Sequence, residues 1–300
     1  MDDATRSAMV KVLLGQQDVL YHYCSTNTFQ QIISNRTIRL SALTLSNDAL
    51  EGKLVSAVIK RLAQANKVEP WRIERLMERV DMLENLFDGL GLCLSEAGDL
   101  LSQWRGYADD AHGFSIGFSR SYLQWLGQIK ADLPLPGFGI HKVLYKDEEH
   151  ESELRPSYDE MMKSVEAGAL QAGLVTLLGG PRSEEAAAME KTAADQLSRT
   201  ILMLFFKWFL LKSDAFSEER EVRLISYFFR SDADAGVRYR ATRNCIIPYR
   251  EFALQEQERN PIVEVYIGPK QRTPVKEIEY FLASNGFGNV NVMRSAAPYR

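Results

Sequence analysis

Short stretches in which apolar residues alternate with polar ones, or run on without interruption, recur along the chain and predict β-strands. These stretches are Val19–His22, Thr37–Ser41, Gly91–Ser95, Gly113–Phe118, Ile140–Tyr145, Val222–Phe229 and Ile262–Gly268. Segments with helical patterns separate several of them. This arrangement predicts an α+β fold with a central mixed or antiparallel sheet.

Helix signals occur between the predicted strands. Polar residues at 25–28 form an N-cap region before a helix at Phe29–Ser34. The charged segment Glu51–Phe87 predicts two helices, because Pro70 interrupts it. A last helix is predicted at Pro274–Asn285, and Gly286 fits its C-terminal end.

The segment from Glu148 to Lys212 differs in character from its surroundings. It is rich in Ala, Glu, Met and Leu, contains a break at Gly179–Pro181, and resumes with a helix start at Ser183. We expect a helical insertion at about 148–212 between two strands of the sheet. The whole chain, residues 1–300, then forms a single α+β domain.

The longest apolar run, Ile201–Leu211, is too short to span a membrane. A spanning helix needs roughly 20 apolar residues, and Lys207 interrupts this run. A helix that is apolar on every side must be covered. We therefore expect a buried core helix, with a partner-binding or dimer helix as the alternative, and no membrane association.

Composition narrows the class of protein. The chain has 300 residues, of which 45% are hydrophobic and 25% charged, with a formal net charge of -4. Such a chain lacks the overall positive charge that is typical of proteins binding nucleic acid or an anionic membrane. Three single cysteines and a polar, acidic N-terminus favour the reducing cytoplasm over export.

Several familiar sites are absent from the sequence. It contains no glycine-rich nucleotide-binding fingerprint, no phosphate-binding loop and no His-Glu-x-x-His motif. The four histidines have no metal-ligand spacing, so no metal is expected.

Two strand-end segments carry candidate chemistry. Alternation places His22 on one side of its strand and Tyr21 and Tyr23 on the other. Glu221 and Arg223 share one side of a later strand, where they can form an ion pair or contribute to a site. A histidine in this setting can be a structural hydrogen-bonding residue or a ligand contact, so both interpretations stay open.

Seven blocks in a set order resemble a bacterial family known only as domain of unknown function 2971. The blocks are Leu20–Tyr23, Ile38–Ser41, Asn47–Asp48 with Glu51, Leu94–Ser95 with Trp104 and Tyr107, Gly113–Phe118, Glu219–Ile225 and the final Pro298–Arg300. This resemblance spans nearly the whole chain.

That family in turn is distantly similar to ADP-ribosyltransferases, which implies a split sheet and NAD as substrate. In those enzymes a His or Arg bonds the adenosine ribose, a central aromatic or Ser contacts nicotinamide, and a Glu stabilises the oxocarbenium-like charge. The resemblance implies catalytic roles for His22, Tyr107 and Glu221, with Ser95 as the other candidate for the central position. The resemblance implies that NAD is contacted by His22, Tyr23, Arg39, Ser95, Trp104 and Tyr107. It implies that the substrate is contacted by Asn47, Asp48, Arg105 and Arg223. Trp104 and Arg105 are expected on a flanking loop.

The expected function is therefore an NAD-consuming transferase that modifies a protein or nucleic acid, as a toxin or phage-defence effector. One alternative is a non-catalytic binding or oligomerisation module held together by a buried polar network, with a second copy of the chain as a candidate partner. A nucleic-acid-binding protein or nuclease is the other alternative, and it depends on Arg238, Arg240 and Arg243.

Overall fold

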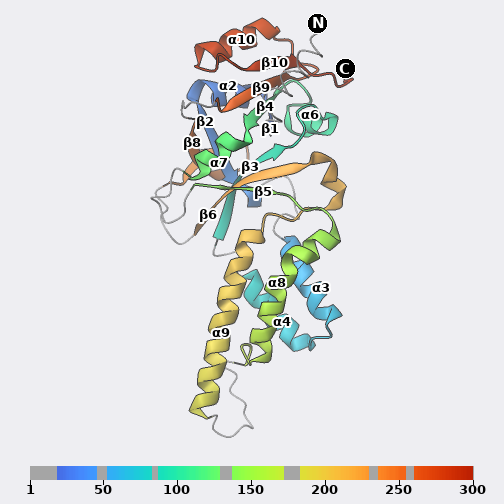
Figure 1. The fold of residues 1–300 in the computed structure, drawn as a ribbon, viewed down its shortest axis with the longest axis vertical. Coiled ribbons are helices and arrows are strands. Elements are labelled where there is room, and N and C mark those ends of the chain that lie inside the picture. Colours follow the sequence, from blue (N-terminus) through green and yellow to red (C-terminus); the bar gives the residue numbers. More distant parts are fainter. Residues whose placement is uncertain are drawn as a thin grey trace.

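The computed structural model describes residues 19–45, 53–82, 87–128, 137–171, 183–229, 236–254 and 260–299. Asn47, Asp48, Glu51 and the break at Gly179–Pro181 lie outside the described residues. Within them the protein is an α+β molecule with a sheet at one end and a helical lobe at the other (Figure 1).

Ten strands form a mostly antiparallel open sheet among the described residues. They are β1 Val19–Cys24, β2 Thr37–Ala42, β3 Phe87–Ser95, β4 Phe114–Ser119, β5 Gly139–Lys142, β6 Glu221–Phe229, β7 Arg238–Ala241, β8 Ile246–Ala253, β9 Ile262–Ile267 and β10 Asn291–Arg294. Their order is β10-β9-β4-β1-β3-β2-β8-β7, with β6 between β3 and β5. The β9–β10 pair is parallel. The predicted fold class is confirmed.

The sheet divides at β3, because three strands pair with it. β6 occupies one edge of β3 along its whole length. A strand has only two edges, so β1 and β2 must share the other. β1 pairs there at Ser95, and β2 pairs at Gly91 and Leu90. β1 and β2 therefore leave β3 at opposite ends, which splits the sheet between them.

The local helix signals are confirmed. Ser25 caps α2 (Thr26–Asn35) by accepting a 3.2 Å hydrogen bond from the Thr28 amide. Pro70 is the first residue of α4 (Pro70–Asp81), which follows α3 (Lys53–Ala65). Ser183 caps α9 (Glu184–Leu204). Gly286, at φ +86°, follows α10 (Val275–Ser284) in the left-handed conformation that glycine permits.

Two different layers cover the two faces of the sheet. One face is apolar and packs against α2, α10 and α7 (Arg120–Gln128), with Leu20, Ile116 and Leu224 fully buried there. On the other face, the helical lobe covers one end of β3 and β6. α6 (Leu101–Tyr107) covers the end beside β1, where Trp104 packs edge-on against Tyr23.

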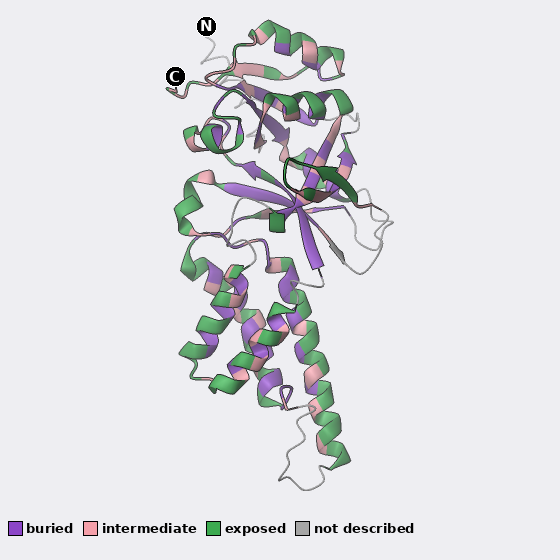
Figure 2. Ribbon diagram, turned by 180° about the vertical axis from the view of Figure 1, so that it is seen from behind, coloured by how far each residue is buried: buried purple, intermediate pink, exposed green. Residues whose placement is uncertain are grey.

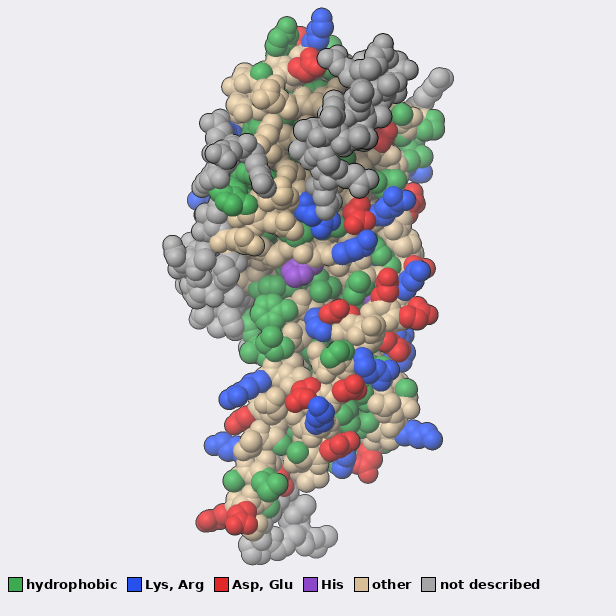
Figure 3. Space-filling model, viewed as in Figure 1, with side chains coloured by type: hydrophobic (Ala, Val, Ile, Leu, Met, Phe, Trp, Pro, Cys, Tyr) green, Lys and Arg blue, Asp and Glu red, His purple; other side chains and the backbone are tan. Residues whose placement is uncertain are grey.

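The helical lobe is built from two separate parts of the chain. α8 (Asp147–Glu166) and α9 come from the predicted insertion, and α3 and α4, which lie between β2 and β3, pack against them. The buried sides of these helices face one another (Figure 2). Charged side chains of both signs are interspersed over the face of the lobe that Figure 3 shows.

The apolar run at 201–211 is only partly helical. α9 ends at Leu204, a short 3₁₀ turn follows at Phe205–Lys207, and Leu211 forms an isolated bridge with Leu144. Residues such as Ile201, Phe205 and Phe209 are buried in the lobe, as expected for a core segment. Met203 and Phe206 are exposed, so the run is not covered on every side. None of the described helices combines the length and apolar composition that crossing a membrane requires.

Candidate functional site

The polar face of the sheet gathers residues from three strands. Ser95 on β3 is the cross-strand partner of both Glu221 on β6 and Tyr21 on β1. Arg223 is the partner of Cys93 one pair further along β3. Side chains of paired residues project from the same face of a sheet, so these five residues share one face.

Glu221 is the carboxylate of this group, and its side chain is enclosed by cations. Its side chain accepts hydrogen bonds from Arg223 Nε at 2.7 Å and from Arg223 Nη2 at 3.0 Å. Its backbone amide donates to the Tyr145 hydroxyl at 2.7 Å. The residue is 4% exposed. Burial alone would raise its pKa, but the Arg223 guanidinium and Lys212 outweigh burial and lower the pKa to about 2.

Lys212 connects Glu221 to a second carboxylate. Its ammonium donates to Glu221 Oε2 at 3.0 Å and to Glu219 Oε2 at 2.5 Å. Burial alone would lower the pKa of Lys212, but the two carboxylates raise it above its usual value. We call Lys212, Glu219, Glu221 and Arg223 the charge cluster; its two cations and two anions balance.

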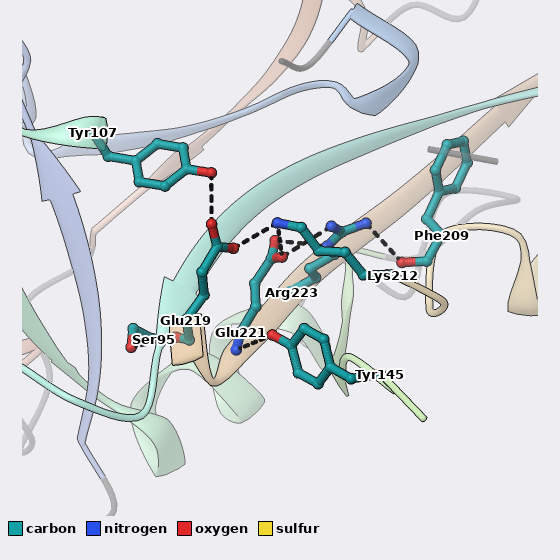
Figure 4. A network of polar contacts seen from close by, with 8 residues as sticks. All are labelled: Ser95, Tyr107, Tyr145, Phe209, Lys212, Glu219, Glu221 and Arg223. Atoms are coloured by element: carbon teal, nitrogen blue, oxygen red, sulfur yellow. Dashed lines mark hydrogen bonds and ion pairs between the residues drawn. The ribbon is translucent and has the colours of Figure 1, made fainter. Parts of the chain in front are cut away.

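Glu219 is the least buried member of the charge cluster, with 12% of its side chain exposed. Ser95 Oγ donates to the Glu219 carbonyl at 2.7 Å, and Arg220, with φ of 46°, turns the chain so that Glu219 and Glu221 both reach Lys212. The Tyr107 hydroxyl, at the end of α6, donates to Glu219 Oε1 at 3.1 Å. Figure 4 shows this line of contacts from Tyr107 to Phe209, whose carbonyl accepts from Arg223.

Tyr107 differs from the rest of the group in exposure. It is 41% exposed, whereas Glu221, Arg223 and Lys212 are all buried. Burial of part of the ring, together with nearby Glu219, raises the pKa of its hydroxyl. The phenol therefore stays protonated at neutral pH and acts as a hydrogen-bond donor to Glu219.

His22 does not join this group. It pairs with Ile116 and lies on the side of Leu20 and Cys24, opposite the face that carries Ser95 and Glu221. Its Nδ1 is 3.0 Å from the Cys93 carbonyl oxygen, which can only accept, so Nδ1 is the donor. Packing around the ring lowers its pKa. The structure does not bring His22 to the face that carries Glu221, because successive residues of a strand face opposite ways.

Tyr23 and Trp104 form a separate buried aromatic group. Trp104 is fully buried and donates from Nε1 to Asp99 at 2.6 Å, while the Tyr23 hydroxyl donates to the Ala97 carbonyl at 2.8 Å. Trp104 and Arg105 lie on α6 and not on the flanking loop that the sequence suggested. Burial of its ring leaves Trp104 no surface on which a ligand could stack.

Two other predicted contacts lie elsewhere. Arg39 Nε is paired with Glu251 on β8 at 2.9 Å, and its guanidinium lies over the Tyr249 ring. Arg105 is exposed, with its guanidinium over the Tyr299 ring. Neither residue has a hydrogen bond to the charge cluster.

Sequence reasoning missed Lys212, Glu219 and Tyr145. Tyr145 follows β5 at the end of a predicted strand, and Lys212 directly follows the longest apolar run. A lone lysine after a buried segment, a few residues before two glutamates, is the one local signal that could have indicated this charge cluster. Within the described residues, no group of three or more His, Cys, Asp or Glu side chains is placed to hold a metal ion.

Comparisons with known proteins give a family match over part of the chain. No curated protein and no solved structure matches the chain. A family described as protein of unknown function (DUF2971) matches residues 103–224. The match is shorter than the nearly whole-chain resemblance read from the sequence. It nevertheless contains Tyr107, Tyr145 and the whole charge cluster, while Ser95 and His22 lie outside it. Over residues 103–224 the chain is therefore similar to this family of unknown function.

Proposed function

We propose that the protein is an NAD-consuming enzyme of the ADP-ribosyltransferase kind that modifies a macromolecule. The observation that carries the proposal is the Tyr107–Glu219–Lys212 contact, in which a carboxylate at the rim of a buried charge cluster is held by an exposed aromatic residue. Such an enzyme would suit a toxin or a phage-defence effector. NAD is its substrate, and no metal takes part.

The chemistry requires a carboxylate that a substrate can reach. In the reaction, the bond between the nicotinamide nitrogen and ribose C1′ breaks, and its electron pair leaves with nicotinamide. An acceptor nucleophile, or water, forms the new bond to C1′ and loses its proton. A nearby carboxylate stabilises the positive charge that develops on the ribose in between.

Glu219 meets this requirement better than Glu221. Both Glu221 oxygens accept hydrogen bonds from buried cations, whereas Glu219 lies at the rim beside exposed Tyr107. We therefore assign the substrate-contacting role to Glu219 and the nicotinamide-stacking role to Tyr107. Glu221, Arg223 and Lys212 act as positioning residues: Lys212 holds the Glu219 carboxylate in place, and Glu221 and Arg223 hold Lys212.

The test is nicotinamide release from NAD by the full-length protein. Replacing one preorganised electrostatic group typically costs a factor of about 10² to 10³ in turnover, so we expect Glu219→Gln to lose at least about a hundredfold. Glu218→Gln is the matched control, because Glu218 is an exposed carboxylate one residue away. Equal turnover in Glu219→Gln and wild type would remove Glu219 from the mechanism.

A specific observation favours a second candidate, a non-catalytic binding module. The two cations and two anions of the charge cluster satisfy one another, as a purely structural network requires. On this view the cluster joins β6 to the helical lobe through Arg223 and the Phe209 carbonyl. Folded wild-type protein that neither binds NAD in calorimetry nor releases nicotinamide would favour this candidate.

A further inference from the structure

We infer that the edge of the sheet formed by β7 and its neighbours binds single-stranded nucleic acid through the phosphate backbone. This inference is independent of the charge cluster and of the proposed enzyme activity. It concerns the basic edge, which we define as Arg39, Arg238, Arg240 and Arg243.

The basic edge concentrates positive charge in an acidic protein. Among the described residues, the basic edge has four arginines and a single carboxylate, Glu251, in contact with them; a fifth arginine nearby, Arg250, is buried and donates to Ser226. The whole chain has a formal net charge of -4. A local excess of about three positive charges on such a chain is the electrostatic pattern expected for a polyanion partner.

The strand register places the arginines together. Arg238 pairs with Tyr249 and Arg240 with Ile247, so both project from the same face of β7. Arg39 on β2 pairs with Glu251 across from β8, on that same face. Arg39 and Arg238 both reach Glu251, at 2.9 and 3.2 Å. One carboxylate thus holds two guanidinium groups side by side, which neutralises only one of the two charges.

The edge is open to a partner. All four residues of β7 are exposed (Figure 2, where exposed residues are green), and β7 is the last strand of the sheet in the order of described strands. Tyr239 lies on the opposite face of β7 from the two arginines and is 67% exposed. The ring is therefore available for base stacking on the other face of the same exposed edge strand, where a nucleic acid that crosses the edge could reach it.

These features favour single-stranded over double-stranded nucleic acid. A single strand can follow a narrow strand edge and turn a base onto Tyr239, and stacking of this kind tolerates any base. The described residues here form a β-edge, with no helix that could enter a major groove. The partner is therefore expected to bind without strong sequence preference and with strong salt dependence.

The test measures fluorescence anisotropy of a labelled oligouridylate with the full-length protein at increasing salt. Each phosphate contact in a single strand adds about 0.7 to the slope of log affinity against log salt, so three arginines predict a slope of about -2. Affinity should fall roughly 20-fold between about 50 and 200 mM salt. A triple variant, Arg238→Ala with Arg240→Ala and Arg243→Ala, should lose both the binding and the slope.

A matched variant separates this site from general charge effects. Replacing Lys60, Lys191 and Arg199 by Ala removes the same charge from exposed positions on the helical lobe, and we expect wild-type affinity and slope. A double variant, Arg240→Ala with Arg243→Ala, keeps the Arg238–Glu251 pair and guards against misfolding; its slope should fall by about 1.4. Absence of binding by wild type at low salt, or equal losses in the two triple variants, would overturn the inference.

A competing explanation is that the arginines only keep the exposed edge from pairing with another copy. It predicts that the triple variant self-associates in light scattering while wild type shows no oligonucleotide binding. The nucleic-acid site is supported instead if wild type binds the oligonucleotide in a salt-dependent way and the triple variant stays monomeric but does not bind it.

Discussion

At the scale of the residue, the most informative side chain is Glu221. Its position two residues before Arg223 on one strand predicts that both lie on the same face, and the 2.7 Å contact between them agrees. A buried ion pair is costly to break from one side, because the remaining charge is left without a partner. Glu221 is therefore expected to matter for stability first and for any reaction only through Glu219.

The depressed pKa of Glu221 predicts a defined acid dependence of stability. The Glu221 carboxyl has a pKa of about 2 in the folded protein and an ordinary pKa of 4.5 in the unfolded chain. Its ionised form therefore stabilises the fold fully above pH 4.5. This contribution is lost as the pH falls from 4.5 to about 2. The shift corresponds to about 3 kcal/mol. Urea unfolding should show Glu221→Gln well below wild type at neutral pH, with the difference shrinking near the lower pKa. An equal difference at both pH values would contradict this.

Tyr145 tests how much the backbone contact to Glu221 contributes. Tyr145→Phe removes the hydroxyl that accepts from the Glu221 amide and leaves a buried donor unpaired. Such a loss costs about 1–3 kcal/mol in the free energy of unfolding. Tyr280→Phe is the matched control, because Tyr280 is exposed on α10. Thermal unfolding of the two variants should differ clearly, and equal melting temperatures would show that the amide finds another acceptor.

At the scale of the element, α6 links the candidate site to the end of the chain. Asp99, just before α6, accepts from Trp104 Nε1 and from the Ala296 amide, and Tyr299 donates to Asp110 after the helix at 2.6 Å. Asp110 also accepts from Lys270 at 2.8 Å. The segment after β10 therefore forms hydrogen bonds next to both ends of α6, the helix that carries Tyr107.

Asp99→Ala should loosen α6 without unfolding the sheet. The change removes the shared acceptor of Trp104 and Ala296, so backbone hydrogen exchange in α6 should speed up while α10 stays protected. Asp159→Ala, at an exposed position on α8, is the control and should change neither helix. Unchanged exchange in α6 would mean that packing of Trp104 against Tyr23 holds the helix by itself.

At the scale of the whole molecule, the helical lobe depends on segments far apart in sequence. α3 and α4 precede β3, whereas α8 and α9 lie between β5 and β6, and they share one apolar core. Neither pair of helices can cover its apolar side alone, so the lobe must form as a unit.

A cavity in that core should weaken the lobe selectively. Leu197 on α9 is fully buried, and Leu→Ala at such a position costs about 2–5 kcal/mol. Leu202→Ala on the same helix is the control, since Leu202 is 40% exposed. Hydrogen exchange in Leu197→Ala should rise in α3 and α8 more than in α2. A uniform rise would show that lobe and sheet unfold together.

Local signals predicted much of the fold, and the failures have physical reasons. Ser25 and Pro70 marked helix starts, because capping depends on a few neighbouring residues. β7 and β8 were not predicted as strands, because charged residues and Pro248 obscure their alternation at the edge of the sheet. α6 was read as a connection because a seven-residue helix shows too little of the helical period.

The candidate site could be predicted only in part. Tyr107, Ser95, Glu221 and Arg223 were chosen from the sequence and do lie together, while His22 lies on the other side of the sheet. Lys212 and Glu219 were not chosen. Their contact depends on the turn at Arg220 and on the path of the chain after α9, and neither leaves a periodic pattern.

The sequence by itself determined most of the elements, several helix starts and the alternation along the predicted strands, since these depend on residues a few positions apart. Alternation separated His22 from Tyr21 and Tyr23, but it could not say which side would be polar. Only the tertiary structure decided that, by pairing Ser95 with Tyr21 and Glu221 from distant parts of the chain. Strand pairing joins residues far apart in sequence, so their common environment is a property of the folded sheet.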